Sequence, residues 1–327
     1  MGIDPPIERH GARGRRVVVR HVVAGRGPSG GPAMTDVVGR LTELTEETAC
    51  IERRDGSLVR VPLADVVTWK VVPDRPVRSR RALTFDADEL TRIMSRGWPA
   101  VVSEPLGEWE LRSSGGFTGR ANSVAVHGDP GLPFDDALTA VEEFYATHRS
   151  TPTAQVAIGS AHEQAFLEAG WTPGAMARPG ALVQVADLAR DQQADPEARI
   201  APRADDAWLS LYPRAEDPAL ARAVLEGPPT VGFVAIGDPV VAIGRVVVTG
   251  EWVGVAAVEV VPDRRREGLG LRIVRTALAW AVESGADKAH LQTMRDNTAS
   301  LALYAPFGFV DHHEYRYLQP GRPTLST

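Results

Sequence analysis

The sequence predicts a mixed α/β (α+β) protein, in which two tandem units of mixed sheets flanked by helices follow a small all-β barrel. Strand-like and helix-like segments alternate through most of the chain. The order helix, strand, short helix, glycine-aromatic pair occurs at residues 134–171 and again at 269–309, which indicates two similar units. Short alternating runs flank Asp55-Gly56, a strong hairpin signal, and predict the barrel.

Length and composition narrow the class of protein. At about 150 residues per domain, 327 residues predict two or three domains. Hydrophobic residues make up 43% of the sequence and charged residues 24%, which is typical of a globular protein and excludes a fibrous one. Cys50 is the sole cysteine, and no Cys/His cluster has zinc-ligand spacing. We therefore expect no disulfide, no metal and a cytoplasmic location. The apolar stretches are too short to cross a membrane.

Charge is distributed unevenly along the chain. Residues 1–33 contain six arginines against Asp4 and Glu8, whereas the whole chain carries a net charge of −6. An acidic body argues against a nucleic-acid partner, which would require a basic surface, and favours a cationic one. Residues 1–33 lack hydrophobic periodicity and are rich in glycine and proline, so we predict a disordered leader. The more regular pattern after Met34 suggests that the protein itself starts there.

Residues 34–75 are predicted to form the barrel. Its alternating runs are expected to be strands at residues 37–41, 48–52, 58–62 and 66–72. This pattern resembles a Src-homology-3-like barrel. Such barrels serve as structural appendages or bind peptides or nucleic acid, and the acidic balance of this segment argues against nucleic acid.

The two α/β units are predicted at residues 82–187 and 200–320, with a polar linker between them. Periodicity in the first unit predicts helices at 86–95, 134–148 and 162–169 and strands at 109–112, 123–126 and 154–158. Periodicity in the second unit predicts helices at 269–284 and 298–306 and strands at 231–236, 240–248, 252–261, 289–294 and 314–318.

A glycine-containing loop joins a strand to the long helix of the second unit. Gly268 and Gly270 allow the backbone to approach a ligand closely, and three consecutive arginines at 264–266 add positive charge. Unpaired amide groups and the dipole at the start of a helix attract anions. The segment therefore predicts a phosphate-binding loop, although it matches neither a P-loop nor a dinucleotide fingerprint.

Several motifs in this region resemble the GNAT superfamily of acyl-CoA N-acyltransferases. Residues 265–270 match the family's loop, written Gln/Arg-x-x-Gly-x-Gly/Ala, and Val260-Val261-Pro262 matches the strand end before it. Asn297 together with residues 303–309 resembles the block that follows. The resemblance identifies residues 200–320 as an acetyl-CoA-binding catalytic GNAT domain. It also implies that the preceding strand diverges from its neighbour.

The resemblance implies a role for each matched residue. Backbone groups of Val258 and Val260 would bind the pantetheine as a pseudo-strand would. Asn297 would contact the pantetheine or its neighbouring phosphate. Tyr304 corresponds to the tyrosine that protonates the departing thiolate, although packing on the Gly308-Phe309 corner is the alternative. The pyrophosphate would be held by the loop, namely Arg265, Arg266, Glu267, Gly268, Leu269 and Gly270.

The motifs do not identify a single residue as the general base. Glu259 is the first candidate, because period-two alternation groups it with Val255 and Ala257, two positions where family members place bases. Both of these positions are apolar here, and Gln292 stands where some members carry a glutamate. The weaker candidates are Glu251, His290 and Glu314, while His312 and His313 are expected to be exposed loop residues.

The unit at 82–187 has the element order of a GNAT domain but lacks its loop. The segment between Val126 and Leu138 carries acids in place of arginines, so we predict a degenerate GNAT-like domain that shapes the acceptor cleft. The run at 115–123 resembles actinobacterial-type tandem GNAT proteins with an N-terminal barrel. Its polar residues Arg120, Asn122 and Ser123 either reach the acceptor or tie a turn.

These observations predict an N-acetyltransferase. It would move acetyl from acetyl-CoA to a primary amine by direct attack, without a covalent enzyme intermediate. The expected acceptor is a protein lysine or a cationic small-molecule amine, and the oligomeric state stays open. The competing hypothesis is a non-catalytic acyl-CoA-binding regulatory or adaptor protein, because the usual base positions are apolar or neutral.

Overall fold

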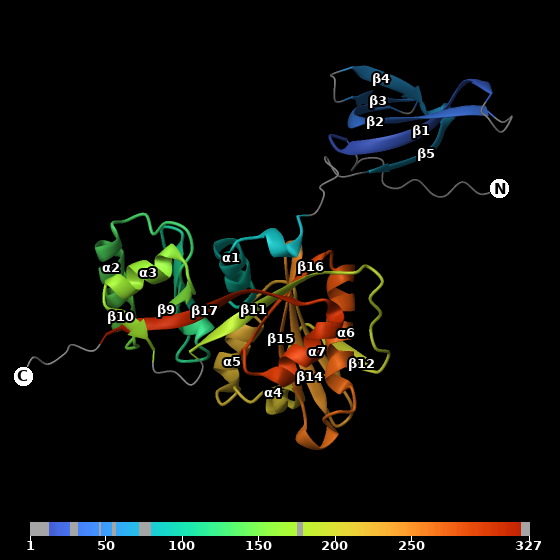
Figure 1. Cartoon of the computed structure of the whole chain (residues 1–327). Coiled ribbons are helices and arrows are strands. Elements are labelled where there is room, and N and C mark those ends of the chain that lie inside the picture. Colours follow the sequence, from blue (N-terminus) through green and yellow to red (C-terminus); the bar gives the residue numbers. More distant parts are fainter. Residues whose placement is uncertain are drawn as a thin grey trace, which may run out of the picture. The chain divides into compact units, whose positions relative to one another are not determined.

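A computed structural model describes residues 13–26, 32–45, 47–53, 57–71, 80–174 and 179–321. The chain divides into two compact units, Met1–Ser79 and Arg80–Thr327, and each is considered by itself (Figure 1). Within the described residues no helix is long and apolar enough to cross a membrane.

The N-terminal unit is a small β domain. Its described residues form a five-stranded sheet in the order β4-β3-β2-β1-β5 around a core that includes Val17, Val19, Leu41 and Ile51. The predicted turn at 54–56 lies outside the described residues. The strands are β1 (Arg16–Arg26), β2 (Pro32–Leu44), β3 (Thr48–Glu52), β4 (Leu58–Pro62) and β5 (Val66–Val71).

The prediction of a disordered leader at 1–33 is wrong for residues 16–26. These residues form β1, which pairs with both β2 and β5. Val17 and Val19 are fully buried, so alternating valines supply core that the arginine-rich and glycine-rich composition concealed. Met34 lies inside β2, and a chain that began there would lack β1.

Replacing Val19 with alanine is expected to destabilise the barrel by roughly 2 kcal/mol, because a fully buried side chain is lost from a small core. Hydrogen exchange of the barrel amides in the full chain measures the change. The matched variant Val67→Ala alters a valine that is half exposed, so its exchange rates should stay close to those of the parent. Equal rates for both variants would mean that β1 does not support the core.

The second unit is built on one mixed sheet. Its described residues form twelve strands, in the order β12-β13-β14-β15-β16-β11-β17-β9-β8-β7-β6, with β10 paired to β17. The strands are β6 (Val102–Leu106), β7 (Trp109–Ser113), β8 (Val124–Ala125), β9 (Ala154–Ala157), β10 (Trp171–Pro173), β11 (Gly180–Asp187), β12 (Ala198–Ala201), β13 (Val231–Ile236), β14 (Ala242–Thr249), β15 (Trp252–Val260), β16 (Lys288–Thr293) and β17 (Val310–Pro320).

Helices cover the faces of this sheet. The α-helices are α1 (Ala87–Gly97), α2 (Phe134–Thr147), α3 (Ala161–Glu168), α4 (Asp206–Leu211), α5 (Pro218–Leu225), α6 (Leu269–Glu283) and α7 (Thr298–Tyr304), and a short 3-10 helix, η4, spans Arg120–Asn122. One core lies beneath α6 and includes Ile273 and Leu278. A second core, which includes Trp208 and Phe233, packs against α4 and α5.

The tandem arrangement is confirmed, but the two repeats are not separate units. We refer to residues 82–187 as the first repeat and 200–320 as the second repeat. In each repeat one strand runs parallel to the next across a helix: β8 to β9 across α2, and β15 to β16 across α6. However, β11 of the first repeat pairs with β16 of the second, and β17 pairs with β9 and β11 (Figure 1). This strand exchange joins both repeats in one sheet.

Candidate functional site

The sheet opens between β15 and β16. Their parallel pairing runs from Trp252 opposite Lys288 to Val255 opposite Leu291, and no later pair is found among the described residues. The second half of β15 therefore has one edge that is not paired to β16, as expected from the GNAT resemblance. Backbone groups on such an edge are available to an extended ligand.

A cleft of about 610 Å³ lies along this open edge and the loop that follows it. Gly268 has a left-handed backbone, with φ of +76°, and immediately precedes α6. The first amide groups of a helix have no acceptor within it, so the start of α6 favours an anion in this cleft. The predicted cofactor-binding residues that line it are Val258, Val260, Arg265, Arg266, Gly268, Leu269, Gly270 and Asn297.

Glu267 differs from the other predicted loop residues. Its carboxylate accepts two hydrogen bonds from Arg264 Nε, at 2.9 and 2.8 Å. This guanidinium holds the pKa of Glu267 below its usual value. Glu267 is not among the residues that line the cleft. Its side chain therefore neutralises Arg264, and Arg265 and Arg266 remain the positive side chains beside the start of α6.

A second cleft, of about 420 Å³, adjoins the first. Both clefts are lined by Glu259, Asn297 and Tyr304. Tyr304 is buried and its ring meets Phe309 edge-on at 5.6 Å between centroids. Burial, and then the charge of Glu259, raise the pKa of Tyr304 above its ordinary value, so the phenol keeps its proton at neutral pH. Tyr304 thus packs on the corner and also faces the junction of the clefts.

The predicted grouping of Glu259 with Val255 on one face of β15 is wrong. The register of β14 and β15 shifts near Ala257, whose backbone is left-handed with φ of +53°. Val255 packs in the core beneath α6, and so do Val258 and Val260, which strict alternation would place on the opposite face. This β-bulge reverses the alternation, so Glu259 lies on the face of Ala257, as predicted, but opposite to Val255.

The first repeat contributes to the second cleft. Trp98, at the end of α1, and Arg120, in η4, line it together with Tyr212 and Arg214. Trp98, Tyr212 and Arg214 were missed from the sequence, because no local motif marks them. Asn122 instead ties a turn, accepting hydrogen bonds from the amides of residues 114 and 116. Ser123 is fully buried.

The first repeat has no equivalent anion site at the loop before α2. The amide of Gly128 donates to Asp88 Oδ2, and that of Asp129 donates to Glu108 Oε2, each at 2.9 Å. The protein's own carboxylates therefore occupy amides in this loop. These carboxylates come from α1 and from the turn between β6 and β7, outside the loop itself.

The weaker base candidates lie outside both clefts. Glu251 pairs with Lys288 at 3.1 Å, and Glu314 with Arg295 at 2.7 Å. Burial, and then the charge of Arg120, lower the pKa of His290 to about 3. His312 and His313 lie on β17 and contact each other, and are not the exposed loop residues expected. Among the described residues no group of three or more His, Cys, Asp or Glu side chains is placed to hold a metal.

An opened sheet beside a glycine-containing loop and helix, together with a second cleft, defines a GNAT-type acetyltransferase. The chain belongs to the family described as "Probable histone acetyltransferase Rv0428c C-terminal", whose model matches residues 84–318. Residues 12–70 match "Rv0428c N-terminal Sm-like domain", so the N-terminal β domain, which we continue to call the barrel, is Sm-like and includes β1.

Individual relatives agree with this membership. The chain is 28% identical over 317 residues to "Probable histone acetyltransferase Rv0428c" of Mycobacterium tuberculosis, with 93% of this chain and 94% of the relative covered. It is 26% identical to "Uncharacterized N-acetyltransferase YobR" of Bacillus subtilis, covering 71% and 98%. A GCN5-related N-acetyltransferase from Kribbella flavida shares the fold, with a TM-score of 0.51, 19% identity and coverage of 74% and 98%.

Proposed function

We propose that the protein transfers acetyl from acetyl-CoA to a primary amine by direct attack. The observation that carries this proposal is the meeting of the two clefts at Glu259 and Tyr304. One cleft has the features of a donor site and the other has room for an acceptor. We call them the donor cleft and the acceptor cleft.

The donor cleft fits acetyl-CoA. The start of α6 and the arginines of the loop suit the pyrophosphate, which carries negative charge. The open edge of β15 at Val258 and Val260 suits the amide groups of the pantetheine. Asn297 Oδ1 accepts a hydrogen bond from the amide of Ser300, which holds the Asn297 side chain at the start of α7. Acetyl-CoA supplies the activated thioester.

Two side chains would move protons during transfer. The acceptor arrives as an ammonium and must lose a proton before its nitrogen can attack. Glu259 is the carboxylate that lines both clefts, so we assign it as the general base. Tyr304 would donate its phenolic proton to the departing thiolate, and burial keeps that proton in place until then.

The variant Glu259→Gln is expected to lower kcat by about 100-fold and to remove the decrease in rate that accompanies protonation of the base at low pH. Rates of thiol release measured across a pH series test this. Glu314→Gln is a suitable control, because Glu314 pairs with Arg295 and does not line either cleft. An unchanged pH profile in Glu259→Gln would move the base elsewhere or assign its role to water.

For the acceptor we propose only a broad class, a cationic primary amine. The acidic net charge favours a cationic amine, and a relative is named as a probable histone acetyltransferase. Both a protein lysine and a small-molecule amine are therefore tested by measuring thiol release with lysine peptides, polyamines and aminoglycosides. We also propose a cytoplasmic location, based on the single cysteine.

The competing function is a non-catalytic acyl-CoA-binding module. Gln292 favours it, since this neutral amide stands where a carboxylate base would be useful and is held by Tyr315, whose hydroxyl donates to Gln292 Oε1 at 2.8 Å. Tight binding of CoA by calorimetry with no thiol release from any amine would support this function over transfer.

A further inference from the structure

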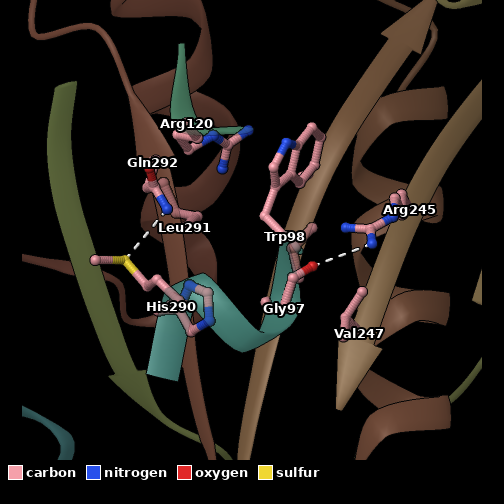
Figure 2. Close-up of a pocket in the computed structure, with 12 residues that line it drawn as sticks. Gly97, Trp98, Arg120, Arg245, Val247, His290, Leu291 and Gln292 are labelled. Carbon is pink, nitrogen blue, oxygen red and sulfur yellow. Dashed lines mark hydrogen bonds between the residues drawn. The ribbon is translucent and has the colours of Figure 1, made fainter. Parts of the chain in front are cut away.

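Two arginines stack on one tryptophan at the inner end of the acceptor cleft. The guanidinium of Arg120 lies 3.9 Å from the centre of the Trp98 ring, and that of Arg245 lies 4.7 Å from it. Figure 2 shows the indole between the two guanidinium groups. Like charges are thus held close together, with an aromatic ring between them.

The two guanidinium groups have no carboxylate partner within the part of the chain that the structure describes. Arg245 is only 2% exposed, and it donates to the carbonyls of Leu225 at 2.8 Å and Gly97 at 3.1 Å. Burial, and then the charge of Arg120, lower the pKa of Arg245 to about 9. Among the described residues, no Asp or Glu forms an ion pair with Arg120 or Arg245. A buried charge without a counter-ion is costly, so this end of the cleft is electrostatically suited to an anion.

A small cavity extends this cationic region inward. Its volume is about 20 Å³, enough for a water molecule, and it is lined by Arg120, Arg245 and His290 (Figure 2). His290 is only 7% exposed, and its Nδ1 has no hydrogen-bond partner among the described residues. The cavity adjoins the acceptor cleft, because Trp98, Arg120 and Gln292 line both. The cavity is therefore lined by both arginines and by a histidine that has an unsatisfied ring nitrogen.

The charged side chains of the acceptor cleft differ in sign between its two ends. Glu259 lines the junction with the donor cleft, and Arg120 lines the junction with the inner cavity. Arg214 and Asp296, which are of opposite sign, also line the acceptor cleft. The inner cavity has arginines in its lining and no carboxylate. This polarity matches a molecule that carries an ammonium at one end and an anion at the other.

Building on the proposed function, we propose that the acceptor is a small amine that also carries a carboxylate, which binds Arg120 while the amine lies near Glu259. A guanidinium stacked on an indole keeps its edge available for a bidentate carboxylate. Arg245 adds positive potential from behind the ring. A polycationic protein tail would meet repulsion at this end of the cleft.

Paired acceptors test the proposal through kinetics. We would compare glycine, β-alanine, glutamate, lysine and phenylalanine with their amides, measuring thiol release from acetyl-CoA. The best acid should exceed its amide by at least about tenfold in kcat/KM, as expected for a charge-assisted contact. In Arg120→Gln this ratio should fall to about one, mainly through KM. Arg92→Gln is the control, because Arg92 pairs with Glu108 at 2.8 Å and does not line the cleft.

A binding measurement makes the test independent of turnover. Trp98 Nε1 donates to Thr118 Oγ1 at 3.0 Å, and its indole N–H resonance can be assigned with Trp98→Phe. Titration with the acids should shift this resonance, titration with the amides should not, and Arg120→Gln should abolish the shift.

The outcomes distinguish failure of the proposed carboxylate site from failure of the proposed acetyl transfer. No shift with any acid, or equal shifts with acids and amides, would overturn the carboxylate site. Equal kcat/KM for acids and amides, or turnover restricted to lysine peptides, would overturn it while keeping acetyl transfer. An acid-specific shift without thiol release from any amine would support the carboxylate site and reject the proposed function.

Discussion

The variant Gly268→Val is expected to weaken CoA binding by about 100-fold. Gly268 has φ of +76° at the start of α6, a conformation that costs an ordinary residue about 1–2 kcal/mol and a β-branched residue more. A Cβ at this position would meet no atom within 4 Å, so the Cβ itself adds no clash and the strain comes from the backbone conformation. Relaxation of the strain would turn the loop amides away from the pyrophosphate, with further loss of charge-assisted hydrogen bonds. Calorimetric titration with CoA measures the change.

Gly285→Val is the matched control. Gly285 follows the other end of α6, has φ of +96°, and a Cβ there would also meet no atom within 4 Å. Both variants therefore place a β-branched residue at positive φ, one at each end of the same helix, but only Gly268 lines the donor cleft. Gly285→Val should retain parental affinity. Equal affinities for the two variants would contradict the assignment of this loop to CoA.

The variant Tyr304→Phe is expected to lower kcat by about 100-fold or more, the usual effect of losing a general acid. CoA affinity should remain unchanged, because the phenyl ring preserves the packing on Phe309. Since burial and Glu259 raise the pKa of Tyr304, the parent phenol stays protonated through neutral pH. The defect in the variant should therefore be similar from pH 6 to 8, and kcat with saturating amine measures it.

Tyr145→Phe controls for the loss of a buried hydroxyl. Tyr145 is fully buried in the first repeat, and its hydroxyl donates to the carbonyl of Arg112 at 3.1 Å. The lost hydrogen bond should cost about 1 kcal/mol of stability without changing kcat. If Tyr304→Phe kept parental turnover, the phenol would have only the packing role at the Gly308-Phe309 corner.

The sequence predicted the donor cleft better than the acceptor cleft. Residues of the predicted loop lie within a few positions of one another, and all but Glu267 line the cleft. Glu267 differs because its carboxylate pairs with Arg264, a contact that the motif does not record. Glu259 lies at the junction of the clefts as a base candidate should, although the alternation used to select it breaks at Ala257.

The N-terminal barrel shows where composition fails to predict structure. Composition suggested disorder for residues 1–33, yet alternating valines at 17 and 19 form part of its core. Whether these residues fold depends on the strands with which they pair. β1 lies between β2 and β5, and β5 follows it by about 40 positions in the sequence. A local average of glycine, proline and arginine cannot detect a partner that far along the chain.

By itself, the sequence determined the tandem α/β repeats, the strand-loop-helix that builds the donor cleft, and the absence of that loop from the first repeat. These features depend on contiguous residues, because helix periodicity, left-handed glycine and the amides that begin a helix are local properties. Tertiary structure alone decided the exchange of β11 and β17, the face of Glu259, and the meeting of Trp98 and Arg120 with Arg245. The strand exchange and the contacts with Arg245 join residues more than 100 positions apart and depend on how whole elements pack. The face of Glu259 depends on the register between β14 and β15, which the alternation within β15 alone does not encode.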